Sequence, residues 1–282
     1  MFYGKVERNW VLLAFFLLVL VALFSILRHD KAELSPFEKQ HIGTLIFQNE
    51  CAGQRANLTT WNSGEAFPSL GIGHFIWYPA NQTGPFKESF PALMAFFQQH
   101  GVALPQWLVQ TLKHGAPWPS KEAFEQAKTG QQLSELRALL WQTFDLQVEF
   151  MMQRLERALP AILTSLPADR RPSIRSRFDR IAATPMGYYA LIDYVNFKGE
   201  GIKASERYHG QGWGLLQVLE QMGDAGDAVE AFADAAVFVL ERRVANAPPE
   251  RNEARWLPGW KNRIASYVRE QRKFSGQVST TR

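Results

Sequence analysis

The sequence contains very little cysteine: Cys51 is the single one among 282 residues. One cysteine excludes an intrachain disulfide framework and any cysteine-based metal site. No HExxH motif or spaced histidine pair is present either, so we expect neither metal catalysis nor a cofactor. Beyond Leu27 no uninterrupted apolar run approaches the length of a membrane span, which disfavours a transporter or channel subunit.

Dense positive charge is also absent. The chain has 31 Lys and Arg against 27 Asp and Glu, a formal net charge of +4 and a pI near 9.2. The basic residues are scattered, apart from short pairs such as Arg170-Arg171. A nucleic-acid surface needs a denser basic patch, so we expect no nucleic-acid partner. Mild basicity suits a membrane surface or an anionic cell-wall polymer.

The one long apolar run lies at the N-terminus. Trp10 to Leu27 contains no charged residue and no proline, and its length as a helix roughly matches a hydrocarbon core of about 30 Å. A cleaved signal peptide is the alternative, but its apolar region is shorter and a small-x-small site should follow it. We therefore predict a single-pass anchor over 10–27, a cytoplasmic head over 1–9 and a stalk over 28–34. Positive charge is balanced across the run, although the long C-terminal part fits export.

A helix is predicted directly after the stalk. Ser35, Pro36 and Glu38 form a capping box with proline at the first helical position. Glu50 falls at the C-terminal end of this helix. The negative partial charge of a helix C-terminus disfavours an ionised carboxylate, so we expect Glu50 to be protonated near neutral pH. Cys51 is expected to be a small buried hydrophobe.

The predicted fold class is α+β, mostly α: a helical domain over 35–274 with a small β-hairpin near its start. The hairpin pairs Leu58–Trp61 with Ser69–Ile76. A disordered tail is expected over 275–282. Helices are predicted over 90–99, 106–113, 121–128, 134–159, 228–245 and 261–272, with two more flanking a glycine-rich loop within 185–222.

Glu50 and the run Ser69-Leu70-Gly71-Ile72-Gly73-His74 resemble the phage-type lysozymes (muramidases) of the lysozyme-like superfamily. In that family an early helix ends in the catalytic glutamate, and a hairpin carries an acidic residue and then a threonine before an I-G-x-G-H run. Glu50 matches the glutamate and Ser69 takes the threonine position. Weaker similarity covers 194–201 and 259–264, whereas about 85 to 185 matches no family. The resemblance implies a divergent, membrane-anchored lysozyme-like domain.

The second carboxylate departs from the family pattern. Counting back from His74, the family's aspartate position falls on Ser63, with Asn62 adjacent and Glu65 two positions later. Either Glu65 is the second carboxylate, or the enzyme uses one glutamic acid as lytic transglycosylases do.

The candidate catalytic residues are Glu50 as general acid, Glu65 as an ionised carboxylate in a turn, and Ser69 as a hydrogen-bond partner of the attacking water. Surface or structural roles are the alternative for each. Aromatic side chains could stack on sugars or pack in the core. The candidate substrate-binding residues are Asn62, His74, Trp77, Tyr78 and Asn196.

Two functions remain open. The first is a glycosidase in the bacterial inner membrane, with its C-terminal domain in the periplasm, that cleaves the glycan strands of peptidoglycan. The second is a catalytically silent peptidoglycan-binding or scaffold protein of an envelope complex, with protein partners there.

Overall fold

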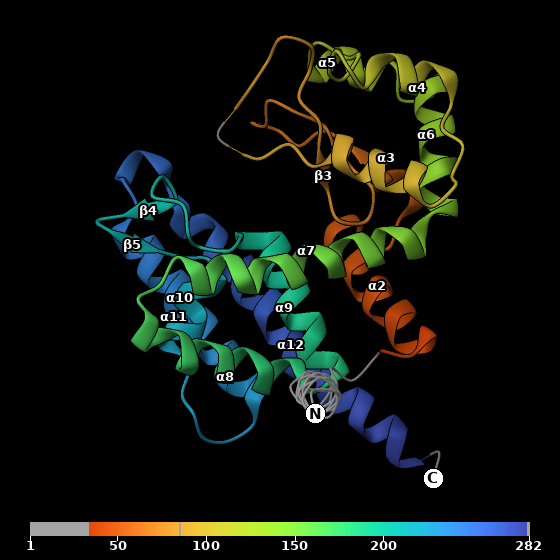
Figure 1. The fold of residues 1–282 in the computed structure, drawn as a ribbon. Helices are drawn as coiled ribbons and strands as arrows, with labels where there is room; N and C mark the ends of the chain where they lie inside the picture. Colours follow the sequence, from red (N-terminus) through yellow and green to blue (C-terminus); the bar gives the residue numbers. More distant parts are fainter. Residues whose placement is uncertain (1–33, 85, 281–282) are drawn as a thin grey trace, which may run out of the picture. The chain divides into compact units, whose positions relative to one another are not determined.

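A computed structural model describes residues 34–84 and 86–280, which form a mostly helical α+β domain with a small three-stranded antiparallel sheet (Figure 1). This confirms the predicted fold class at that level. The predicted head, anchor and most of the stalk lie outside the described residues. Within the residues described, no helix is long and apolar enough to cross a membrane.

Helix α2 spans Pro36–Cys51 and begins as predicted. The Ser35 hydroxyl accepts from the Glu38 backbone N–H, and the Glu38 carboxylate accepts from the Ser35 backbone N–H at 2.7 Å. The helix ends at Ala52, whose backbone is left-handed with φ of 50°. Glu50 therefore lies in the last turn of a helix that is fixed at both ends.

The sheet is formed by three two-residue strands, β1 (Thr59–Thr60), β2 (Ser69–Leu70) and β3 (Phe75–Ile76). Both pairs are antiparallel, and Ser69 lies opposite Thr60 and Ile76. The predicted second strand therefore folds back on itself through the turn 71–74. Gly71 and His74 allow this reversal, with φ of 73° and 48°.

Two helices replace the single long helix predicted over 134–159. Helix α6 (Gln131–Gln142) ends at Thr143, where α7 (Phe144–Thr164) begins. The Thr143 backbone leaves the helical region, with φ of −103° and ψ of 25°. The Gln147 side chain donates to the Leu140 carbonyl at 2.6 Å, which satisfies a carbonyl group at the end of α6. A polar side chain about one turn after the break thus stabilises it.

The helices predicted over 90–99, 106–113, 121–128 and 228–245 lie close to their predicted positions. Helix α12 continues to Thr280, past Ser275, where a disordered tail is predicted. Before α7 the helices are α3 (Phe90–Gln99), α4 (Gln106–Thr111) and α5 (Lys121–Gln126); after it come α8 (Arg171–Ala182), α9 (Pro185–Lys198), α10 (Leu215–Gln221), α11 (Ala228–Asn246) and α12 (Leu257–Thr280). Short 3₁₀ helices span Arg55–Leu58, Ala168–Arg170, Pro249–Arg251 and Glu253–Trp256, and a second hairpin pairs β4 (Arg207–Tyr208) with β5 (Gln211–Gly212).

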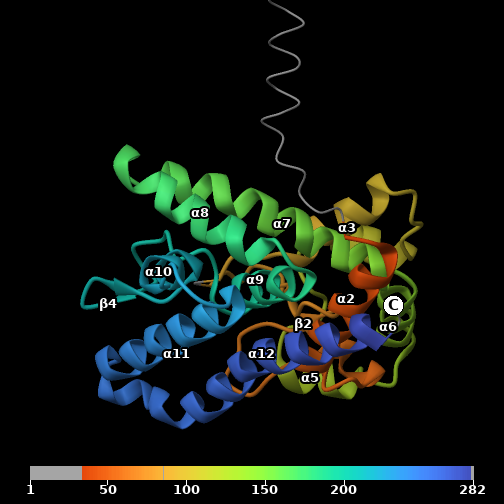
Figure 2. The same ribbon diagram turned by 90° about the horizontal axis from the view of Figure 1, so that it is seen from below.

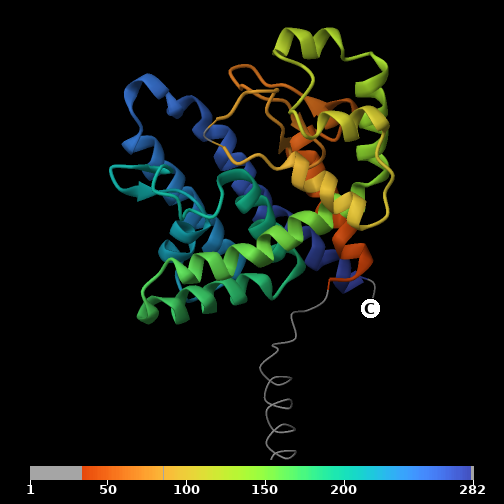
Figure 3. The ribbon, with the colours of Figure 1, turned by 45° about the horizontal axis from the view of Figure 1, so that its top comes forward.

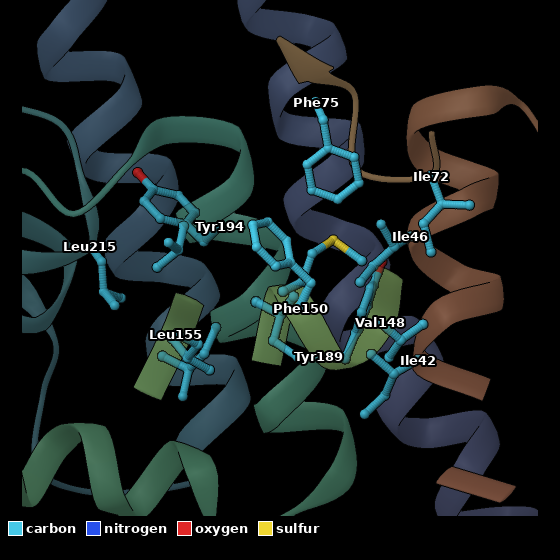
Figure 4. Packing of buried hydrophobic residues seen from close by; sticks show 14 of the residues in the cluster. Ile42, Ile46, Ile72, Phe75, Val148, Phe150, Leu155, Tyr189, Tyr194 and Leu215 are labelled. Atoms are coloured by element: carbon cyan, nitrogen blue, oxygen red, sulfur yellow. The ribbon is translucent and has the colours of Figure 1, made fainter. Parts of the chain in front are cut away.

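Helix α7 extends from the sheet and its helices, α3 to α6, to the group formed by α8 to α12 (Figures 2 and 3). The core along α7 is shown in Figure 4. Ile42 and Ile46 of α2, Val148 of α7 and Ile72 of the turn are almost fully buried there. Each such side chain contributes about 1.5–3 kcal/mol on burial. The last turn of α2 and the turn 71–74 are therefore held against the same core, which brings Glu50 and His74 together.

Candidate active site

Glu50 is the point where three distant parts of the chain meet. Its Oε1 accepts from the Arg263 guanidinium of α12 at 2.5 Å and from the Asn196 amide of α9 at 3.2 Å. Its Oε2 lies 3.2 Å from Nδ1 of His74. The Glu50 side chain is 10% exposed, so these contacts replace nearly all of its water.

The turn 71–74 holds one side of this cluster. The Asn196 amide, besides contacting Glu50, donates to the Gly73 carbonyl at 3.0 Å. Gln147 of α7 accepts from the Ile72 backbone N–H at 2.9 Å. A Cβ atom on Gly71 would lie 2.3 Å from the same Gln147 oxygen, so only glycine fits there. The turn is thus positioned by α7 and α9.

Asp193 holds the other side. Both of its carboxylate oxygens accept from Arg263 at 2.8 Å, and the Tyr267 hydroxyl donates to it at 2.6 Å. The Asn49 amide adds a further hydrogen bond at 3.2 Å. The Asp193 side chain is fully buried, and a bidentate pair of this kind fixes the guanidinium plane. Arg263 is therefore oriented by Asp193 and presented to Glu50.

The ionisation of Glu50 differs from the prediction. Burial alone would raise its pKa, but the charges of Arg263 and His74, together with hydrogen bonds from Arg263 and Asn196, lower it below the ordinary value. The expectation of a glutamic acid protonated near neutral pH is therefore wrong for the free protein. The weak partial charge of a helix end is outweighed by a guanidinium in direct contact.

Glu65 shows the opposite shift. Its carboxylate accepts from the Asn62 amide at 3.1 Å and from the Ser69 hydroxyl at 3.4 Å. Burial raises the pKa of Glu65; these two hydrogen bonds oppose the rise, and the charge of Glu50 adds to it. The sequence predicts that solvent favours the ionised form of Glu65, whereas its surroundings in the structure shift the pKa upward. Glu50 and Glu65 are near enough to interact electrostatically.

Ser63, at the position of the family's aspartate, has no acidic role. Its hydroxyl accepts from the Lys121 ammonium at 2.9 Å, and its side chain is exposed. Ser69 is almost fully buried on β2, and its hydroxyl is directed to Glu65.

Trp77 and Tyr78, for which the sequence left sugar stacking and core packing open, are both buried. They are 0% and 5% exposed. The Trp77 ring stacks on Phe90 with centroids 4.9 Å apart and meets Trp118 edge-on at 6.1 Å. Burial of these large rings contributes more stability than an exposed stacking surface would. Because aromatic residues suit either role, the sequence did not distinguish the two.

Sequence reasoning missed Arg263 and Asp193 as site residues. Arg263 lies in the 259–264 segment that resembles the family, and that similarity was the available signal. Asp193 is the one acidic residue in the apolar stretch Tyr188–Val195, and a buried charge of this kind needs a partner. Cys51 is buried as expected, and burial raises the pKa of its thiol to about 12.

The cluster therefore combines two carboxylates with opposite pKa shifts, a histidine, an amide and a guanidinium. Acid–base chemistry needs a proton donor and a proton acceptor, and two carboxyl groups with opposite pKa shifts suit these two roles. Comparisons with family models, curated proteins and solved structures find no match to this chain.

Proposed function

We propose that this chain is a lysozyme-type glycoside hydrolase that cleaves the glycan strands of peptidoglycan. The observation that carries the proposal is the convergence on Glu50. Asn196 and Arg263 reach its carboxylate although they lie 146 and 213 residues away in the sequence. These segments are the ones that resemble phage-type lysozymes. The resemblance was based on sequence motifs alone, so the contacts of Asn196 and Arg263 with Glu50 support it independently.

Glycosidic cleavage needs a proton for the leaving oxygen and a second carboxylate for the opposite side of the reaction. In the free protein the raised pKa favours Glu65 as the proton carrier, and the lowered pKa favours Glu50 as the ionised partner. This reverses the roles expected from the sequence. Ser69 and Asn62 hold the Glu65 carboxyl, whereas His74, Asn196 and Arg263 hold Glu50.

We propose the cellular setting that the sequence predicts. The proposed enzyme is bound to the bacterial inner membrane through residues 10–27, with the domain beginning at Leu34 in the periplasm, beside its substrate. Envelope proteins are the proposed partners there.

A catalytically silent peptidoglycan-binding or scaffold protein is the second candidate. The observation that favours it is the Glu50–Arg263 contact, because a carboxylate paired with a guanidinium resists protonation. A lytic transglycosylase with one glutamic acid is a third, favoured by Ser63, which leaves the family's aspartate position without a carboxylate.

Glu50→Gln separates the enzyme from the silent protein. We expect release of soluble glycan from purified cell wall to fall about 100-fold or more, since one acid–base group is removed. Glu149→Gln is the matched control, because that side chain is 48% exposed. Equal release by wild type and Glu50→Gln would exclude the catalytic role. Mass analysis of the products then distinguishes reducing ends of a hydrolase from anhydro ends of a transglycosylase.

A further inference from the structure

A row of cations and aromatic rings leads away from Glu50. The guanidinium carbon of Arg263 lies 4.4 Å from the centre of the Phe197 ring. The ammonium nitrogen of Lys198 lies 3.8 Å from that ring centre and 3.6 Å from the ring of Trp260. Both cations thus lie against the Phe197 ring. Because the two distances of 4.4 and 3.8 Å meet at its centre, the Lys198 nitrogen is no more than about 8 Å from the guanidinium that contacts Glu50.

Lys198 differs from its neighbouring cations because no acid is paired with it. Arg263 is paired with Asp193 and Glu50. Arg243, 5.1 Å from the Trp260 ring, donates to both oxygens of Glu253 at 2.7 and 2.8 Å. Among residues 34–84 and 86–280, the Lys198 ammonium forms neither a hydrogen bond nor an ion pair.

The surroundings of Lys198 favour the arrival of an anion. Aromatic faces attract the ammonium but accept none of its hydrogen bonds in the way an oxygen does. Burial, and then the charges of Arg243 and Arg263, lower the pKa of Lys198 well below its usual value, and the charge of Glu253, itself paired with Arg243, opposes that shift only in part. A carboxylate beside the nitrogen would offset the remaining cost. Lys198 is a partly exposed residue, which leaves a side open to a ligand.

We propose that Lys198 binds a carboxylate of the glycan strand and makes the site selective for acidic glycans. This inference rests on the proposed function. Peptidoglycan strands carry carboxylates on their attached peptides and, at sugars without a peptide, on the free lactyl groups. Lys198 ends helix α9, two residues after Asn196, which donates to Glu50. One strand can therefore contact Glu50 at the bond to be cleaved and Lys198 through its acidic substituent.

The test compares full-length wild type with Lys198→Met on two preparations of the same soluble strands. One preparation keeps its carboxylates, and the other has them converted to neutral amides. We expect the ratio of kcat/KM values, acidic over neutral, to fall about tenfold in Lys198→Met, the size expected for one charge-assisted contact. Lys128→Met is the control, because the Lys128 ammonium already pairs with Glu125 at 3.1 Å, and its ratio should equal that of wild type. If a variant is partly unfolded, both of its kcat/KM values fall by the same factor, so their ratio is unchanged.

Strands freed of peptide distinguish the two sources of carboxylate. If the Lys198→Met effect persists on peptide-free strands, the lactyl carboxylate is the ligand; if it disappears there, the peptide carboxylates are. A ratio unchanged by Lys198→Met on every strand overturns the inference. Calorimetric binding of the same strands gives a second readout. If wild type cleaves no strand, the proposed hydrolase fails, and the Lys198-dependent ratio of binding constants still decides the inference.

Discussion

The candidate site contains two carboxyl groups whose surroundings shift their pKa values in opposite directions. Arg263 and His74 overcome the effect of burial at Glu50, whereas burial dominates at Glu65. Neighbouring groups that differ in this way can divide acid and base roles at one pH. The same shifts affect folding stability, because a pKa that differs between folded and unfolded protein makes the unfolding free energy depend on pH.

Glu65→Gln is therefore expected to stabilise the protein at neutral pH. The raised pKa of Glu65 means that the folded protein holds this proton more tightly, so stability is lost as the pH rises from 4.5 through the folded-state pKa. Glutamine cannot ionise. Urea unfolding from pH 3 to pH 8 should show a gain that grows with pH and vanishes at pH 3.

Glu50→Gln should change the same measurement in the opposite direction. The lowered pKa of Glu50 gives stability that is fully present above 4.5 and is lost as the pH falls through the folded-state pKa. The variant should be less stable than wild type at pH 7 and should approach it in acid. A stabilising Glu50→Gln at pH 7 would contradict the Arg263 contact.

Among the elements, the break between α6 and α7 has the largest consequence for the site. Gln147 is fully buried and joins the break to the turn 71–74, because it donates to the Leu140 carbonyl and accepts from the Ile72 N–H. The turn in turn supplies His74 and the Gly73 carbonyl to the cluster around Glu50. An uninterrupted helix would leave the turn without this support.

Gln147→Leu tests that connection. It leaves one buried N–H and one buried carbonyl without their partner, and each such group costs about 1–3 kcal/mol. We expect the unfolding free energy to fall by about 2–5 kcal/mol in urea denaturation, with loss of glycan release as the turn shifts. Gln142→Leu is the control, because Gln142 is exposed at the end of α6, and changes there stay within about 0.5 kcal/mol. If the two variants are equally stable, Gln147 does not stabilise the break or the turn 71–74.

For the whole molecule, the central feature is a buried cluster of charged groups around Glu50 in a chain with a long apolar run at its N-terminus. The run 10–27 carries no charged residue. We expect the full-length protein in the membrane fraction of bacterial cells, and a chain lacking residues 1–33 in the soluble fraction. Protease added to spheroplasts should digest the domain of the full-length protein, which fits a periplasmic location. Protection from protease would place the domain in the cytoplasm.

Local signals predicted much of the fold. The capping box at Ser35 and the glycines at 71 and 73 act through the backbone of their own segment, so helix α2, the pairing of β1 with β2 and the position of Glu50 could be read from neighbouring residues. The break at Thr143 could not, because the helical periodicity of 134–159 continues across it and the stabilising bonds come from Gln147 and the folded turn.

The sequence alone therefore determined a mostly helical α+β domain that begins with a capped helix, with Glu50 in its last turn, and continues into a short sheet. Only the tertiary structure decided the ionisation of that glutamate. The direction of its pKa depends on Arg263, 213 residues away, and Arg263 is oriented by Asp193 on a third helix. Electrostatic interactions act through space at a few ångströms, so distance along the chain carries no information about them. The same reason explains why the pKa shifts of the two carboxyl groups could not be read from the sequence.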